Sequence, residues 1–144
     1  MAIFIGTDSN DIYLATTEGD NARGDRGDDT LIGNSGSDTL NGNANNDLLF
    51  ADSATQTAGG NDILFGGQGD DTLVGARFGF SADSLGGNRG KDLLIASTNG
   101  GNTLFGGQGN DTIYGSVSNG NTMNGDLGND LLIAGRSSDS HAGR

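Results

Sequence analysis

Two stretches decide the fold: Gly66-Gly67-Gln68-Gly69-Asp70-Asp71-Thr72-Leu73-Val74 and Gly106-Gly107-Gln108-Gly109-Asn110-Asp111-Thr112-Ile113-Tyr114. In each, six residues with turn-forming chemistry end in Asp, and three apolar or β-branched residues follow. We number this nine-residue unit so that Asp is position 6 and the middle apolar residue is position 8. Position 8 is large and apolar or aromatic in nearly every copy. In this register the units begin at Gly6, Ala15, Gly24, Gly33, Gly42, Thr57, Gly66, Phe78, Gly87, Ser97, Gly106, Ser116, Gly125 and Ala134, with extra residues at 51–56, 75–77, Ala96 and Gly115.

The composition excludes several classes of protein. The 144 residues include 28 Gly, no Pro, no Cys and one His, and 19 acidic against 7 basic residues give a net charge of -12. Such a chain is typical of disorder unless the acidic groups are neutralised. The absence of Cys excludes disulfides and thiolate metal sites. The acidic surface argues against nucleic acid as a partner, and no apolar run is long enough for membrane insertion.

The repeat predicts an all-β fold. Three-residue strands cannot form an independent sheet, so they must stack on copies of themselves. We predict a right-handed parallel solenoid of about seven coils. Each coil has two nonapeptides, position 8 points inward, and the coils build two short-stranded parallel sheets. The expected single domain covers residues 1–144: an N-terminal strand or cap at 1–5, repeats at 6–133, and a degenerate last repeat and tail at 134–144.

Alternate units differ in their loops. One set, which we call the strict edge, keeps Gly at position 1 and Asp at position 6 in all seven units, and every extra residue falls in the other set, the bulged edge. Calcium prefers carboxylate and carbonyl oxygens, and glycines let a loop turn through positive φ and aim its carbonyls. Unpaired carboxylates about 4.8 Å apart would repel. About six calcium ions between the seven strict loops would carry +12, and a few more could occupy the bulged edge.

The units resemble the RTX (repeats-in-toxin) family of calcium-binding β-rolls. This resemblance implies that each ion lies between loops of successive coils, held by position-6 carboxylates and loop carbonyls. On the strict edge it assigns ligands to Asp11, Asp29, Asp47, Asp71, Asp92, Asp111 and Asp130, with Gly24, Gly27, Gly66, Gly67, Gly69, Gly87, Gly90, Gly106, Gly107, Gly109, Gly125 and Gly128. The pattern departs from the family at Lys91, beside one ligand, and in the loop before Asp11, which has a single Gly.

The bulged edge leaves two interpretations open. Asp and Asn can cap turns by bonding their own backbone, without a metal. Asp38 and Asp62 are nevertheless candidate calcium ligands, because glycines precede them. Asn102 and Asn121 offer neutral oxygens only, and we expect them to form an amide ladder.

The outward positions suggest what the module contacts. After the strict loops they are almost all apolar or β-branched, as at Ile32, Phe50, Val74, Ile95 and Tyr114, and such a face usually meets a partner. Plain β-propensity and an ice-binding surface are alternatives. We favour a secreted, extracellular structural module without a cleavable signal peptide, which folds on calcium and self-associates into fibres or layers. Other hypotheses are an adhesion module that binds cell-surface glycan, or an isolated fragment of a larger type I-secreted toxin or enzyme. No catalytic constellation is present, so we predict no enzyme activity.

Overall fold

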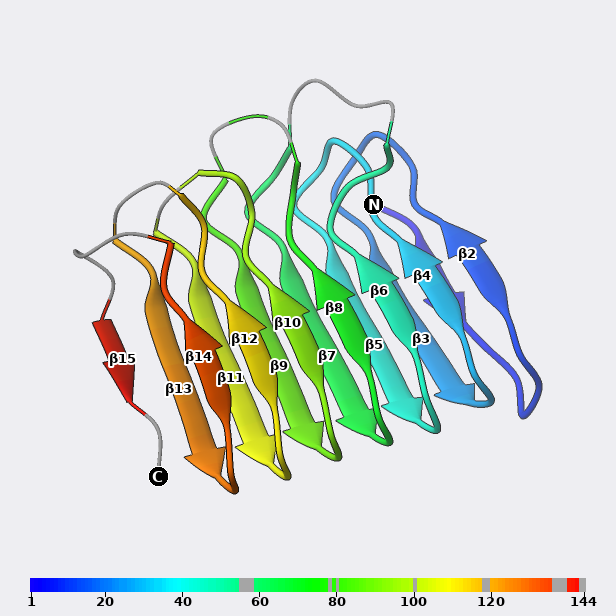
Figure 1. Ribbon diagram of the computed structural model, residues 1–144. Helices are drawn as coiled ribbons and strands as arrows, with labels where there is room; N and C mark the ends of the chain where they lie inside the picture. The colour runs from blue at the N-terminus through cyan, green and yellow to red at the C-terminus, as the bar shows by residue number, and fades with distance from the viewer. Residues whose placement is uncertain are drawn as a thin grey trace.

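The computed structural model describes residues 1–54, 59–77, 79, 81–99, 101–117, 120–135 and 140–142, and of His141 the backbone only. Within these ranges the chain forms fifteen strands (Figure 1). Their bounds are β1 Ile3–Ile5, β2 Ile12–Leu14, β3 Asn21–Arg26, β4 Thr30–Ile32, β5 Thr39–Ala44, β6 Leu48–Phe50, β7 Ile63–Gln68, β8 Thr72–Val74, β9 Ser84–Arg89, β10 Leu93–Ile95, β11 Thr103–Gln108, β12 Thr112–Tyr114, β13 Thr122–Leu127, β14 Leu131–Ile133 and β15 Ser140–Ala142.

The strands build two parallel sheets that face each other. One sheet has eight strands in the order β1-β3-β5-β7-β9-β11-β13-β15, and the other has seven in the order β14-β12-β10-β8-β6-β4-β2. The chain therefore changes sheet at each loop and advances by one strand per coil (Figure 1). The predicted all-β parallel solenoid is confirmed. The described residues contain no helix long and apolar enough to span a membrane.

The core is a single column of position-8 side chains between the sheets. Its fully buried members are Ala22, Leu31, Leu40, Leu49, Leu64, Leu73, Leu85, Leu94, Leu104, Ile113 and Met123. At the first coil the ring of Phe4 stacks on that of Tyr13, with centroids 4.6 Å apart, and at the other end Leu132 is half-buried. Inward-facing position 8 is thus confirmed wherever the side chain is described. The last member of the series, His141, lies outside the described side chains.

The strands of the eight-stranded sheet are longer than the repeat predicts. Six of them, β3 to β13, have six residues instead of three, because they continue through positions 1–3 of the strict loop. Ladder pairing skips position 1: Arg23 pairs with Asn41 and Asp25 with Asn43, while Gly24 between them is left out. Gly24 faces inward and is buried. The first half of each strict loop is therefore part of the sheet, which fixes its position relative to the next coil.

Four bulged loops begin earlier than the sequence register places them, at Ala51, Gly75, Ala96 and Gly115. Backbone N–H groups at the start of each loop donate to the carbonyl that ends the corresponding strand one coil further along: Ala15 to Ile32, Gly33 to Phe50, Ala51 to Val74, Gly75 to Ile95, Ala96 to Tyr114, and Gly115 to Ile133. The equivalents of Gly33 are thus Ala51, Gly75, Ala96 and Gly115. The unit starts predicted at Ser97 and Ser116 are wrong by one residue. Those at Thr57 and Phe78 fall outside the described residues. The extra residues lie inside the loops, because the strand hydrogen bonds continue one residue past the apolar stretch.

Candidate metal centre

The position-6 Asp side chains of the strict edge form a ladder inside the roll. Each N–H at position 6 donates to Oδ1 of the Asp in the next coil, over 2.8–2.9 Å. The ladder runs Asp11, Asp29, Asp47, Asp71, Asp92, Asp111 and Asp130. The structure therefore brings together all seven carboxylates that the repeat singles out. Five of them, Asp29 to Asp111, are 3% exposed or less.

The second carboxylate oxygen distinguishes this ladder from a set of turn caps. Within the described part of the chain, Oδ2 is buried and has no hydrogen-bond partner in six residues: Asp29, Asp47, Asp71, Asp92, Asp111 and Asp130. In Asp11, by contrast, Oδ2 accepts from the N–H and hydroxyl of Thr7, at 2.6 and 3.0 Å. A buried carboxylate oxygen without a donor is costly, and a hard cation is the partner that such an oxygen accepts. The residues present therefore fit calcium.

Glycine at position 1 makes room for that oxygen. A β-carbon built on Gly24 would overlap Oδ2 of Asp29, and the same holds for Gly66 with Asp71. The equivalent residues are Gly42, Gly87, Gly106 and Gly125. None of these six glycines has a positive φ. The sequence interpretation, which explained them by their freedom to turn, is therefore wrong for position 1, where glycine is needed for space. Gly42 belongs to this set although it is not among the predicted site residues; its place in the repeat register is the signal that identifies it.

The other predicted glycines act through their backbone conformation. Gly67 and Gly107 at position 2 have φ of +121° and +112°. The glycines of position 4 also have positive φ, between +112° and +149°: Gly27, Gly69, Gly90, Gly109 and Gly128. Asp or Asn takes positive φ at position 2 of other loops, as at Asn43. These positions turn the chain, as expected, because a left-handed conformation is accessible to Gly and tolerated by Asn and Asp.

Burial makes negative charge on the ladder unfavourable. It raises the pKa of three of these carboxyls to about 7: Asp47, Asp71 and Asp92. It also raises the pKa of Asp29 and Asp111, and neighbouring carboxylates of the ladder add to the effect. Among the described residues no three His, Cys, Asp or Glu side chains converge on one point. Any ion here must therefore combine one or two carboxylates with backbone carbonyls, a mixed oxygen set that calcium accepts.

The bulged edge satisfies its carboxylates locally in most coils. Oδ1 of Asp38 accepts from the N–H of Asp20 at 2.7 Å, and Oδ2 from the N–H of Asn34 at 2.9 Å. Both carboxylate oxygens of Asp38 therefore accept backbone hydrogen bonds without a metal, as in a turn cap. Asp62, the other candidate on this edge, keeps an Oδ2 without a partner among the residues described.

Amide side chains continue the bulged-edge ladder toward the C-terminus. The side-chain amide of Asn102 donates to Oδ1 of Asn121 at 2.9 Å. The N–H of Asp83 donates to Oδ1 of Asn102, also at 2.9 Å. The predicted amide ladder is present, and it needs no charge to be neutralised.

A second, exposed ladder follows position 5 of the strict edge. At this position the backbone N–H of one coil donates to the side chain of the preceding coil. The N–H of Asp70 donates to Oδ1 of Asn46, and the N–H of Lys91 donates to Oδ1 of Asp70, both at 2.8 Å. Lys91 carries no acceptor, and in the described part of the chain no such bond reaches the N–H of Asn110. Lys91 therefore interrupts this ladder and places a positive charge next to Asp92.

Comparison with known families identifies the repeat. A family model described as "RTX calcium-binding nonapeptide repeat (4 copies)" matches residues 5–37, 14–49, 56–78, 96–119 and 117–140. These ranges cover well over half of the chain and contain every strict-edge Asp except Asp92, which lies in the unmatched stretch with Lys91. The comparisons with curated proteins and with solved structures give no match.

Proposed function

The chain belongs to the family of RTX calcium-binding nonapeptide-repeat proteins, and on this premise we propose that it binds Ca²⁺ along the strict edge and folds when it does so. As an RTX β-roll it is a calcium-binding module, itself non-catalytic. The observation that carries the proposal is the row of buried Oδ2 atoms without partners on the strict edge. Turn caps alone would leave no such row, as most of the bulged edge demonstrates.

The proposed stoichiometry is about six ions on this edge. Seven strict loops leave six gaps, and six carboxylates have an Oδ2 without a partner among the described residues. Six divalent ions would also balance the formal net charge of -12. The ligands are Oδ2 of Asp29 and its five successors in the ladder, with carbonyl oxygens of the adjoining loops. The first loop contributes less, because Thr7 already occupies Oδ2 of Asp11.

Folding follows from binding because the apolar core is narrow. Only one position-8 side chain per half-coil is available to offset the conformational entropy of nine residues. The buried carboxylates also repel one another electrostatically. A metal that binds only the folded chain adds its binding free energy to stability. RTX repeats are typical of type I-secreted extracellular proteins. We propose an extracellular location, where calcium at about 10⁻⁴–10⁻³ M matches the affinity of such modules.

Circular dichroism tests this proposal directly. The chain is titrated with calcium, and excess chelator is then added to reverse the change. We expect a cooperative transition from disordered to β-rich near about 10⁻⁴–10⁻³ M calcium. A chain that is already β-rich in excess chelator at neutral pH would contradict calcium-coupled folding.

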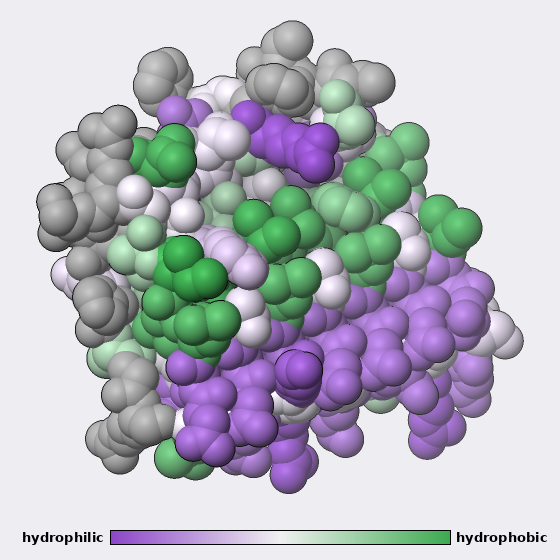
Figure 2. Space-filling view, in the orientation of Figure 1, coloured by the Kyte–Doolittle hydropathy of each residue, from purple (hydrophilic) through white to green (hydrophobic). Residues whose placement is uncertain are grey.

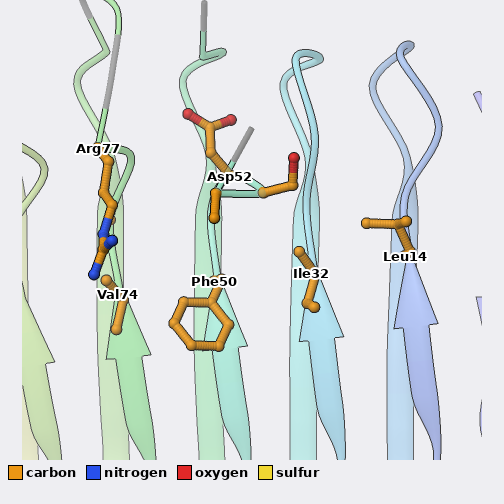
Figure 3. Close-up of a pocket in the computed structure, with 9 residues that line it drawn as sticks. Leu14, Ile32, Phe50, Asp52, Val74 and Arg77 are labelled. Carbon is orange, nitrogen blue, oxygen red and sulfur yellow. The ribbon is translucent and has the colours of Figure 1, made fainter. Parts of the chain in front are cut away.

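We also propose that calcium-loaded rolls associate with one another. Apolar side chains gather on the outer face of the seven-stranded sheet, and hydrophilic residues gather along the strict edge below it (Figure 2). On this face Leu14, Ile32, Phe50 and Val74 line a hollow of about 470 Å³ beneath Asp52 and Arg77 (Figure 3). Large exposed apolar patches favour association, and bound calcium would remove the net charge that keeps copies apart.

Light scattering and negative-stain microscopy test the association. The double variant Val74→Lys/Ile95→Lys places two charges on the apolar face without touching a carboxylate ladder. We expect it to retain calcium-dependent folding and to lose side-to-side contacts. If the calcium-loaded wild type stays monomeric at high concentration, self-association is refuted and calcium binding is unaffected.

A further inference from the structure

Five of the bulged-edge loops pair their second residue with their Asp or Asn. In three loops the second N–H donates to Oδ2 of the Asp, at 2.6–2.9 Å: Thr16 to Asp20, Asn34 to Asp38, and Ala76 to Asp83. In the two Asn loops a serine hydroxyl takes part instead: Ser97 donates to Oδ1 of Asn102 at 2.5 Å, and Ser116 accepts from the amide of Asn121 at 2.9 Å. Every one of these side chains is thus partnered within its own loop.

The loop with the longest insertion breaks this rule. Its second residue is Asp52 and its position-6 residue is Asp62, and the N–H of Asp52 does not donate to Oδ2 of Asp62. Both oxygens of Asp52 and Oδ2 of Asp62 have no hydrogen-bond partner in the described ranges. The two residues are only 9% and 1% exposed. Three carboxylate oxygens are therefore left without donors in one loop.

Asp52 is directed into the loop and away from the apolar hollow. Its carboxylate points away from the ring of Phe50 (Figure 3). A β-carbon built on Gly59, three residues before Asp62, would overlap Oδ2 of Asp52. Burial, followed by the charges of Asp83 and Asp38, raises the pKa of Asp52 to about 6. The carboxylate of Asp52 thus lies near acidic groups of the adjoining coils, and its charge also acts on Asp62.

No basic side chain neutralises this pair in the described part of the chain. The ion pairs seen there use the N-terminal amine, Arg23 and Arg26, all in the first coils. Arg77 lines the neighbouring hollow but forms none of these ion pairs. A buried, uncompensated charge is strongly unfavourable. A cation bound between the two side chains would remove this cost.

We propose that Asp52 and Asp62 hold one divalent cation, separate from the strict-edge row and built with a carboxylate at the second position of the loop. The chemical class is a hard, oxygen-seeking ion. The choice of calcium rests on the proposed function, whereas the site itself rests on the two unpartnered carboxylates. It lies on the opposite edge of the roll from the ladder that starts at Asp11. In this loop the metal ion would take the place that a loop donor has beside the position-6 side chain of the other loops.

Calcium stoichiometry tests the site. The variant Asp52→Ser/Asp62→Asn copies the neutral pair of Ser97 and Asn102, and its fold is checked by circular dichroism in calcium. Bound calcium per chain is counted by equilibrium dialysis and mass spectrometry of the metal. We expect the loss of one ion relative to the wild type, and the same loss in the single variant Asp52→Asn, which retains the side-chain shape.

The control Thr16→Ser/Asp20→Asn makes the same exchange in a loop whose carboxylate is already capped, and it should lose no ion. An unchanged count in both Asp52 variants would overturn the proposal and leave strict-edge binding intact, as expected if the pair shares a proton. A wild type that binds no calcium would overturn both. A loss of one ion in the control as well would also overturn it, because capped carboxylates would then be ligands too.

Discussion

Two adjacent glycines allow the strict-edge geometry to be tested with almost identical substitutions. Gly86 and Gly87 both lie in β9, and neither has a positive φ. A β-carbon on Gly87 would overlap Oδ2 of Asp92 and lie 2.7 Å from its Cβ and Cγ. A β-carbon on Gly86 would meet the ring of Phe65 at 3.4 Å and Oδ1 of Asn88 at 3.7 Å, which are ordinary contacts. Gly87→Ala must therefore displace a ligand of the ladder, and Gly86→Ala need displace nothing.

The two substitutions should change the free energy of unfolding in opposite directions. Forcing atoms into a packed site typically costs about 1–3 kcal/mol, so Gly87→Ala should be destabilising by that amount or more. Replacing Gly where the backbone suits Ala typically stabilises by about 0.4–1 kcal/mol, which is our expectation for Gly86→Ala. The two variants should thus differ by about 1.4–4 kcal/mol in the free energy of unfolding. With a urea m-value of about 2 kcal/mol/M, their unfolding midpoints would lie about 0.7–2 M apart.

The assay is urea unfolding in saturating calcium, followed by circular dichroism, together with a calcium titration of each variant. Gly87→Ala should also raise the calcium midpoint, whereas Gly86→Ala should leave it unchanged or lower it slightly. Equal effects of the two substitutions, or a neutral Gly87→Ala, would refute the inference that position-1 glycine exists to accommodate Oδ2 of Asp92.

Three further predictions concern the charges of the roll. Asp111→Ala should raise the calcium midpoint in a titration followed by circular dichroism, since it removes a ligand and leaves the buried N–H of Asp92 without its acceptor, at a cost of about 1–3 kcal/mol. Asn121→Ala also removes an acceptor, from Asn102, but it removes no ligand, so it should move the midpoint much less, and equal shifts would contradict the difference between the edges. Lys91→Asn should lower that midpoint and stabilise the calcium-loaded roll by about 0.5–1.5 kcal/mol in urea unfolding, because it restores an acceptor to the position-5 ladder; a higher midpoint would show that the charge of Lys91 assists binding. Burial raises the pKa of three ladder carboxyls to about 7, so their protonated form stabilises the metal-free fold. This stabilisation is complete below the unfolded pKa of about 4 and is lost as pH rises through about 7. In excess chelator, circular dichroism should therefore show more β-structure at pH 5 than at pH 8, and the opposite trend would refute the assignment.

The sequence by itself determined the repeat, the inward column and the ladder of carboxylates. Position 8 recurs with nine-residue spacing, and three-residue apolar stretches have no way to be buried except by stacking on one another. The parallel solenoid follows, and with it the alignment of Asp29, Asp47 and Asp71 along one edge. Local spacing was sufficient here because each coil contacts only its neighbours.

Tertiary structure decided what each of these residues contacts. The direction in which a carboxylate points depends on donors in the adjoining coil, so the sequence could not distinguish the free Oδ2 of Asp71 from the capped Oδ2 of Asp38. Nor could it place the start of the bulged loops at Ala51 and Gly75, which is set by hydrogen bonds between coils. The sequence register places Asp52 among the extra residues, so the spacing carries no signal for it. Only the assembled coils bury Asp52 and Asp62 and leave three of their oxygens without donors, because burial depends on residues that are distant in the sequence.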